Sequence, residues 1–333
     1  MTEFEPDRFL KIRKLGKGNF GEVWMSYDLL NEEIVAVKYI KIKSAKPDDR
    51  NKNISSFLRE KEVCELISKK GVDSIAKLIG AFYSLDDDGD IEDLILVSES
   101  GEYNLEQLLK ARSRLNTVGN LSSYSFDEVI GFVAQISEAY KTLQELNIYH
   151  SDTKLENIVY SKSKRKFILI DFGVSKLLKK EEIERKQNQI SLNVAKYGQA
   201  GTEEYNSPEK THYWKWQKWA NEQPDDIEVG NYQETFNPFK CDMWSLGVCL
   251  EKMIGAGKND NIEKLKGNKF LSNIIHNLKE EDWNKRFDSM ALHNYITKNK
   301  LKQLTEKSGI LQKESKLVIV LNREKYERTQ MNG

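Results

Sequence analysis

Four polar residues suited to acid–base and metal chemistry lie close together in residues 150–173. Asp152, Lys154 and Asn157 occur within the run HSDTKLEN, and Asp171 directly follows the apolar run FILI. Magnesium in proteins usually binds one or two carboxylates together with phosphates of the substrate. An aspartate at the end of a buried strand suits such a site, whereas the competing interpretation is a solvated acidic turn after a strand.

A glycine pattern precedes this segment near the N-terminus. Gly16, Gly18 and Gly21, followed by Val23, form G-x-G-x-x-G-x-V. Without Cβ atoms, the backbone of such a loop can lie close to the phosphates of a nucleotide. The pattern links two predicted strands, so it does not match the strand–helix setting of a dinucleotide-binding fingerprint. Taken alone, it also fits an ordinary hairpin with glycines in its turn.

A lysine and a glutamate form a second candidate pair. Lys38 ends V-A-V-K on the strand after the glycine pattern, where Val35 and Val37 flank it, so its aliphatic part is expected to be buried. A buried ammonium group needs a partner. Glu60, on the helix predicted in FLREKEVC, is the expected partner, because Glu62 lies about 200° away around that helix. A surface lysine at a strand end is the alternative.

The order H-x-D-x-K-x-x-N and then D-F-G resembles the catalytic loop and metal-binding turn of the eukaryotic protein kinase family. The lysine two residues after Asp152 makes the serine/threonine branch the most similar. The resemblance implies that Asp152 accepts or orients the proton of the attacking hydroxyl group and that Lys154 neutralises charge on the γ-phosphate. It implies ATP as the phosphoryl donor and Mg²⁺ held by Asn157 and Asp171.

The resemblance also implies where ATP binds. Phe20, at the tip of the glycine loop, would cap the phosphates, and residues 99–101 would offer backbone hydrogen bonds to adenine at the junction of two lobes. Ser98 would guard the back of this pocket, and Lys38 would form with Glu60 the ion pair that activity requires. The implied nucleotide-binding residues are Leu15, Gly16, Gly18, Phe20, Gly21, Val23, Ala36, Lys38, Glu99, Gly101 and Val159.

Later segments match the family in the same order. G-T-E-E-Y followed by S-P-E resembles G-T-x-x-Y-x-A-P-E, with serine in place of alanine. From this resemblance, Thr202 would hydrogen-bond toward the catalytic aspartate and lysine. Glu209 would pair with the buried Arg286, and Asp242 would brace the backbone of the catalytic loop. Each of these three roles could be mimicked by a solvated polar group if the residue stood alone.

The hydrophobic pattern predicts two lobes. Residues 9–100 alternate as strands around one helical stretch, SSFLREKEVCELISKK, with Ser55 or Ser56 as its N-cap, which predicts a five-stranded sheet with a single helix. Residues 101–299 show mainly helical periodicity. We therefore expect an α+β, bilobal, protein-kinase-like fold and one kinase domain over residues 1–299. Residues 300–333 form a charged C-terminal tail, interpreted as a solvated end, with a docking tail as the alternative.

The composition argues against several other classes of protein. The 52 basic and 52 acidic residues give zero net charge, which disfavours nucleic acid or an anionic membrane as the main partner. The N-terminal segment MTEFEPDRFLKIRK lacks the apolar centre of a signal peptide, and no apolar run approaches the length of a membrane span. Three scattered cysteines predict reduced thiols. We expect a cytoplasmic protein, with the nucleus as the alternative, whereas the oligomeric state does not follow.

Three departures from the family bear on regulation. Ser151 stands where most members have an arginine that pairs with a phosphorylated activation-loop residue, so we expect activity without strict dependence on such phosphorylation. The run KKEEIERKQNQ lengthens the activation loop and predicts a short charged helix. A tryptophan-rich insertion at residues 211–240 is the third departure. Its Trp214, Trp216 and Trp219 indicate a local apolar anchor or, less favoured, a substrate-docking patch.

These observations predict an ATP- and Mg²⁺-dependent protein serine/threonine kinase acting on protein substrates. A pseudokinase, which keeps the fold as a binding or scaffolding module without phosphoryl transfer, is the alternative. A small-molecule kinase of similar fold is a third hypothesis, and the G-T-x-x-Y-x-S-P-E segment, a peptide platform in the family, argues against it. The pseudokinase is opposed by the intact set Lys38, Glu60, Asp152, Asn157 and Asp171.

Overall fold

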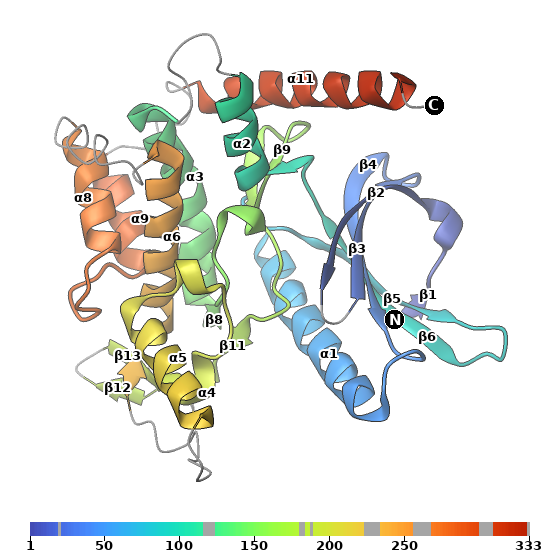
Figure 1. Ribbon diagram of the computed structural model, residues 1–333, viewed down its shortest axis with the longest axis horizontal. Coiled ribbons are helices and arrows are strands. Elements are labelled where there is room, and N and C mark those ends of the chain that lie inside the picture. Colours follow the sequence, from blue (N-terminus) through green and yellow to red (C-terminus); the bar gives the residue numbers. More distant parts are fainter. Residues whose placement is uncertain are drawn as a thin grey trace.

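A lobe built on a β-sheet and a larger lobe of helices make up the described chain (Figure 1). The computed structural model describes all residues except 19–20, 116–123, 180–183, 187–188, 223–233, 256–267, 300–308 and 332–333. The predicted α+β, bilobal fold is confirmed. Among the described residues no helix is long and apolar enough to cross a membrane.

The sheet has six strands in the order β1-β5-β6-β4-β3-β2, one more than predicted. Strands β2 to β6 are the five that the alternating pattern predicts. The added β1 is short and exposed and pairs in parallel with β5, so it carries no alternation. The bounds are β1 Thr2–Glu3, β2 Phe9–Gly18, β3 Gly21–Asp28, β4 Glu33–Lys41, β5 Leu78–Leu85 and β6 Ile91–Glu99.

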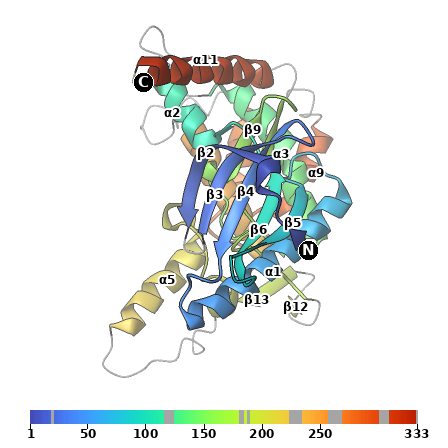
Figure 2. The same ribbon diagram turned by 90° about the vertical axis from the view of Figure 1, so that its right-hand side faces the viewer.

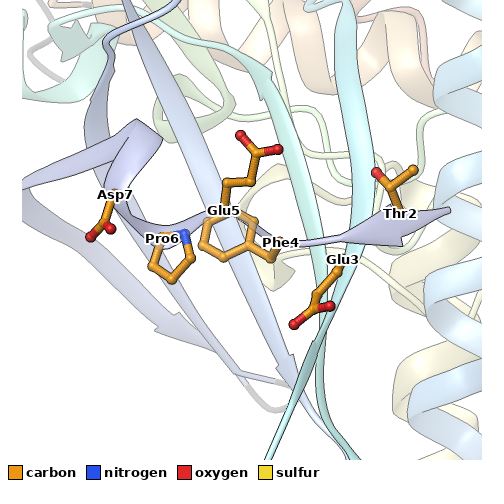
Figure 3. Close-up of a pocket in the computed structure, with 6 residues that line it drawn as sticks. All are labelled: Thr2, Glu3, Phe4, Glu5, Pro6 and Asp7. Carbon is orange, nitrogen blue, oxygen red and sulfur yellow. The ribbon is translucent and has the colours of Figure 1, made fainter.

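The N-terminus is held to the sheet by aromatic packing. The Phe4 ring stacks on Phe9 at 5.3 Å and meets Phe82 edge-on at 5.8 Å between ring centres. The pocket in Figure 3, of about 530 Å³, is lined by residues 2–7 around this contact. Two strands, β5 and β6, separate β1 from β4, which carries Lys38. The pocket is therefore a feature of the sheet edge and not of the predicted nucleotide site.

Helix α1 (Pro47–Lys70) covers one face of the sheet and carries Glu60. It begins directly after Lys46, well before the predicted N-cap at Ser55 or Ser56, and that prediction is wrong. Proline is favourable at the first position of a helix, where its missing N–H has no intrahelical acceptor. The polar residues after Pro47 therefore form the first turns of the helix. Gly71, with φ of 69°, ends it.

The helical lobe is built around the buried helix α3 (Phe126–Glu145). Ser125 and Glu128 form a reciprocal capping box at its start. Helices α6, α8 and α9 pack against α3. The remaining helices are α2 Leu105–Leu115, α4 Val194–Tyr197, α5 Pro208–Asn221, α6 Pro238–Ile254, α8 Lys269–Leu278, α9 Ser289–Lys298 and α11 Ile310–Met331.

Short strands hold the polar segments between the two lobes. Strands β7, β9 and β10 form one small sheet, and β8 pairs with β11. The loop with Asp152 runs from β8 to β9, and Asp171 comes after β10. The bounds are β7 Tyr103–Asn104, β8 Ile148–Tyr149, β9 Ile158–Ser161, β10 Lys166–Leu169, β11 Lys176–Leu177, β12 Glu184–Lys186, β13 Gln189–Asn193 and β14 Thr235–Phe236.

In the segment that lengthens the activation loop, residues 184–186 and 189 lie in β-strands. Strand β12 pairs with β13, and β13 pairs with β14. The predicted short charged helix in KKEEIERKQNQ is therefore wrong for residues 184–186 and 189. The pairing of β13 with β14, from the far end of the tryptophan-rich insertion, is a long-range contact that local charge does not reveal.

Two of the three insertion tryptophans behave as the predicted anchor. Trp214 and Trp216 are partly buried and pack on a cluster that includes Tyr197 and Tyr213. The indole N–H of Trp214 also donates to the carbonyl of Gly198 at 3.0 Å. Trp219, near the end of α5, is 50% exposed. The anchor interpretation therefore holds for the first two rings and not for the third.

The C-terminal helix α11 lies across α2 in both views (Figures 1 and 2). Ile310, Glu314 and Val318 on one face of α11 are fully buried. Arg112 of α2 donates to the Glu314 carboxylate. The interpretation of residues 300–333 as a solvated end is therefore wrong for the first turns of this helix, because one helical face packs on the lobe while Lys313 and Lys316 on the other face are exposed.

Candidate active site

Lys38 on β4 and Glu60 on α1 form an ion pair at the inner face of the sheet. Both carboxylate oxygens of Glu60 lie 2.8 Å from Lys38 Nζ, and Asp171 Oδ1 lies 3.7 Å from it. Burial lowers the pKa of Lys38, but the charges of Glu60 and Asp171 together raise it above its ordinary value. Glu62 is exposed instead. The lysine is therefore charged, and its ammonium group lies beside the carboxylate of Asp171.

The turn from Asp171 to Gly173 passes directly beside this ion pair. A Cβ atom on Gly173 would lie 2.9 Å from Lys38 Nζ and 3.4 Å from Glu60 Oε2. Glycine therefore leaves the pair undisturbed. Asp171 itself has φ of 64°, a left-handed conformation that is costly for a residue with a Cβ atom. Such backbone strain is concentrated at functional sites.

Asp152 is held by three polar side chains. Thr202 Oγ1 donates to its Oδ1 at 2.7 Å, Lys154 Nζ lies 2.7 Å from its Oδ2, and Asn157 Nδ2 lies 3.2 Å from the same oxygen. Burial raises the pKa of Asp152, but the contacts with Lys154 and Thr202 outweigh burial and hold it below its ordinary value. The carboxylate is therefore ionised near neutral pH and can accept a proton.

Asp242 on α6 braces the backbone of the loop that carries Asp152. Its carboxylate accepts the N–H of His150 at 3.0 Å and the N–H of Ser151 at 3.1 Å. Burial raises the pKa of Asp242 to about 6. The His150 ring packs edge-on against Phe172 at 5.2 Å. The structure thus places His150 among packing contacts.

Asn157 and Asp171 provide the right oxygen atoms for a hard cation. The amide nitrogen of Asn157 donates to the carbonyl of Asp152 at 2.8 Å, which leaves its Oδ1 as a ligand. The side chain of Asp171 is 48% exposed. In the described part of the chain no three acidic, histidine or cysteine side chains gather as a complete metal site. A carboxylate and an amide oxygen fit Mg²⁺, provided that substrate phosphates complete its coordination.

Gly16 and Gly18 of the glycine pattern lie on β2, and Gly21 lies on β3. A Cβ atom on Gly16 would meet nothing within 4 Å, whereas one on Gly21 would lie 1.7 Å from the backbone oxygen of Tyr39. Gly21 is therefore required by the close pairing of β3 with β4. Gly18 is the last residue of β2. Phe20, the predicted cap of the phosphates, lies outside the described residues.

The residues predicted to contact adenine come from both lobes. Leu15, Val23 and Ala36 lie on β2, β3 and β4, and Val159 lies on β9. Ala36 pairs in register with Ser98 on β6. Val159 is 6% exposed, and Leu15 is 39% exposed. Strands of the sheet lobe and the first strand after the catalytic loop therefore supply the apolar positions of the predicted pocket.

The connection between the lobes contains Glu99 and Gly101. The side chain of Glu99 is held by the N–H of Lys77 at 3.2 Å and by Lys164, and its backbone N–H donates to the carbonyl of Lys77 at 2.9 Å. A Cβ atom on Gly101 would lie 2.5 Å from the carbonyl oxygen of Tyr160. Glycine at position 101 thus allows the connection to run close to β9.

The segment beyond Thr202 is attached to the helical lobe by a buried ion pair. Arg286 donates to both oxygens of Glu209, at 2.7 and 3.1 Å, as the resemblance implies. The next residue, Lys210, is also buried and lies beside the catalytic loop. The sequence analysis missed it, because a lysine at the start of a helix fits an ordinary solvated charge. Its only sequence signal is its place directly after S-P-E.

Comparison with known families accounts for this arrangement of residues. A family model described as "Protein kinase domain" matches residues 9–317 of the chain. The match covers both lobes and every residue of the candidate active site described above. It also continues into α11, past the predicted domain end at residue 299.

Curated relatives are similar at low identity. The chain is 30% identical over 170 residues to "Cyclin-dependent kinase F-4" of Oryza sativa subsp. japonica, covering 51% of this chain and 32% of that protein. It is 26% identical over 278 residues to "Calcium-dependent protein kinase 4" of Plasmodium berghei, covering 80% of this chain and 42% of that protein. It is 24% identical over 249 residues to "Probable serine/threonine-protein kinase nek3" of Dictyostelium discoideum, covering 74% and 18%. The chain therefore matches less than half the length of each of these relatives.

Proposed function

The chain belongs to the protein kinase family, and from this premise we propose that it is an active protein serine/threonine kinase that uses ATP and Mg²⁺. The observation that carries the proposal is the assembly of Asp152, held by Thr202 and Lys154, opposite the ion pair of Lys38 and Glu60. Family members that bind nucleotide without transfer do not need both halves of this assembly.

The geometry supports Asp152 as the residue that orients and deprotonates the attacking hydroxyl group. Its lowered pKa keeps it ionised. Lys154, which contacts both Asp152 and Thr202, holds a positive charge beside the position of proton transfer. A positioned general base typically contributes a factor of about 10²–10⁴ in rate.

Lys38 is proposed to hold the phosphates of ATP while Glu60 fixes the lysine. Asn157 Oδ1 and the Asp171 carboxylate are proposed to hold Mg²⁺, which when bound neutralises charge on the phosphates during transfer. The exposed carboxylate of Asp171 lies 3.7 Å from Lys38 Nζ, so the metal and lysine positions adjoin. The adenine ring is proposed to lie between Ala36 and Val159, with the backbone of residues 99–101 as its hydrogen-bonding edge.

Serine or threonine as the acceptor is supported by the contact between Lys154 Nζ and Thr202 Oγ1 at 3.0 Å, a pairing that resembles the serine/threonine branch. Names of the relatives agree with this choice. Ser151 offers no cation to a phosphorylated activation segment, so we also propose activity that does not strictly require phosphorylation there. A cytoplasmic or nuclear location fits the three free, buried cysteines.

The experiment is transfer of labelled phosphate from ATP, with Mg²⁺, to a library of serine-, threonine- and tyrosine-containing peptides. We expect label on serine or threonine, and we expect Asp171→Ala to abolish transfer because a metal ligand is lost. Asp88→Ala, at an exposed hairpin carboxylate, is the matched control and should transfer normally. Nucleotide binding without transfer would support the pseudokinase instead, and transfer to small molecules alone would support the small-molecule kinase.

A further inference from the structure

Lys210 is a buried cation that neither the resemblance nor the proposed chemistry uses. Only 3% of its surface is exposed. Its Nζ donates to the carbonyl of Ser151 at 3.3 Å and to the carbonyl of Ala200 at 2.5 Å, and it lies 5.9 Å from the centre of the Tyr149 ring. No carboxylate in the described part of the chain lies within ion-pair distance of it.

The two carbonyls lie on opposite sides of the catalytic hydrogen bond. Ser151 directly precedes Asp152, and Ala200 comes two residues before Thr202, whose hydroxyl donates to Asp152 at 2.7 Å. The hydroxyl of Ser151 also donates to the carbonyl of Ala200 at 3.4 Å. One ammonium group therefore bridges the backbone segments whose side chains meet at the proposed base.

Gly201 shows that the chain makes room for this bridge. Its φ of 131° is a conformation that residues with a Cβ atom rarely adopt, and a Cβ atom there would lie 2.7 Å from Lys210 Nζ and 2.9 Å from the carbonyl of Ser151. A glycine at this position therefore permits the close approach of Ala200, Ser151 and the ammonium group. The close packing around Gly201 is therefore evidence for the bridge that does not depend on the hydrogen bonds of Lys210.

Burying an ammonium group without a carboxylate beside it is costly. Burial holds the pKa of Lys210 below its ordinary value, and the surrounding acidic groups oppose that effect only in part. These groups are Cys241 and Asp242 on α6, Asp152 on the catalytic loop and Glu209 on α5. The two hydrogen bonds to carbonyl groups offset the free-energy cost of burying the ammonium group.

We propose that Lys210 is a positioning residue for phosphoryl transfer, which docks the activation segment at Ala200 onto the catalytic loop at Ser151. The inference rests on the proposed kinase function. The side chain of Ser151 cannot supply a positive charge at the catalytic loop. Lys210 on α5 supplies one through its hydrogen bond to the carbonyl of Ser151. The docked segment keeps Thr202 on Asp152 and keeps the peptide platform in place.

The test compares Lys210→Met, which removes the charge and keeps the length, with Lys210→Arg, which keeps a cation and its donors. Lys215→Met, an exposed lysine on the same helix, is the control. For Lys210→Met we expect kcat/KM for a peptide to fall by about 10²-fold, because the base and the platform are misplaced. Its affinity for a nucleotide analogue should equal that of the wild type, and Lys210→Arg should recover part of the lost rate.

The split between kcat and KM provides a readout that a purely structural role would not change. Because the activation segment is misplaced and the nucleotide site is not, Lys210→Met should lower kcat and raise KM for the peptide while KM for ATP stays at the wild-type value, and the control should match the wild type in all three. Wild-type peptide kinetics in Lys210→Met would overturn the inference. Loss of nucleotide binding together with a lower unfolding temperature in both variants would also overturn it, because Lys210 would then be structural. An inactive wild-type protein would overturn the proposed function itself, before any variant is compared.

Discussion

Residues 150–173 and helix α11 are held to the rest of the chain by different kinds of contact. In residues 150–173 the informative side chains are polar, and their partners lie in other elements: Asp152 meets Thr202, and Asp171 meets Lys38. In α11 the informative residues, Ile310 and Val318, are apolar and hidden among charged neighbours. Polar residues that act together occur in a recognisable order in the sequence. The packing of a single helix shows in the sequence only as a few apolar residues on one face.

The two regions should therefore fail differently when they are mutated. Residues 150–173 sit on a backbone braced by Asp242, so loss of a reactive group there should change rate more than stability. The hydrogen bonds described for helix α11 reach residues outside the proposed reactive set, among them Arg112 and Tyr160. The helix contacts α2 and, through Asn322, the hydroxyl of Tyr103 at 2.8 Å, so its loss should change stability more than rate.

The largest expected effect is on catalysis. Asp152→Asn keeps the shape of the side chain and removes the base, so turnover should fall by a factor of about 10²–10⁴, equivalent to about 3–5.5 kcal/mol at the transition state. Affinity for ATP and the unfolding temperature should stay close to those of the wild type. Steady-state kinetics and thermal unfolding measure both, with Asp88→Asn as the control. Turnover equal to that of the wild type would remove Asp152 from the proposed chemistry.

The second effect is on stability, and α11 contains its own control. Ile310 is fully buried and Ile319 is 50% exposed on the same helix. Ile310→Ala should cost about 2–5 kcal/mol of unfolding free energy, and Ile319→Ala should change it by less than about 0.5 kcal/mol. Denaturant titration measures both, and kcat of the folded variants should be unchanged. Equal stability of the two variants would return α11 to the status of a solvated tail.

Much of the sheet lobe could be predicted because its rules are local. Alternation identified strands β2 to β6, and the position of Glu60 relative to Lys38 followed from helical geometry. Strand β1 could not be identified in this way, since Thr2 and Glu3 are exposed and pair only through the backbone. The start of α1 at Pro47 was missed because its first turns are polar and face solvent.

Contacts between distant segments explain the remaining differences. Strand β13 depends on β14, more than forty residues later by chain number, so the charged run before it was interpreted as a helix. Lys210 could not be recognised from the sequence because its partners are the backbone carbonyl groups of Ser151 and Ala200. Every residue type has a backbone carbonyl group, so the sequence does not indicate such a contact. Glu314 on α11 was likewise read as solvated, although Arg112 of α2 binds it.

The smallest expected effect tests how the polar stretch tunes its own base. The Thr202 hydroxyl donates to Asp152 at 2.7 Å and so stabilises the ionised carboxylate. Thr202→Val removes this donor and keeps the shape, so the pKa of Asp152 should rise. Activity requires the ionised form, so the acidic limb of kcat/KM should move to higher pH while the rate at neutral pH changes little. The ionisation of ATP affects the profiles of both proteins equally, so comparison of the variant with the wild type cancels its contribution. Thr297→Val, at an exposed threonine, serves as the control. An unmoved acidic limb would mean that Thr202 holds the activation segment without tuning the base.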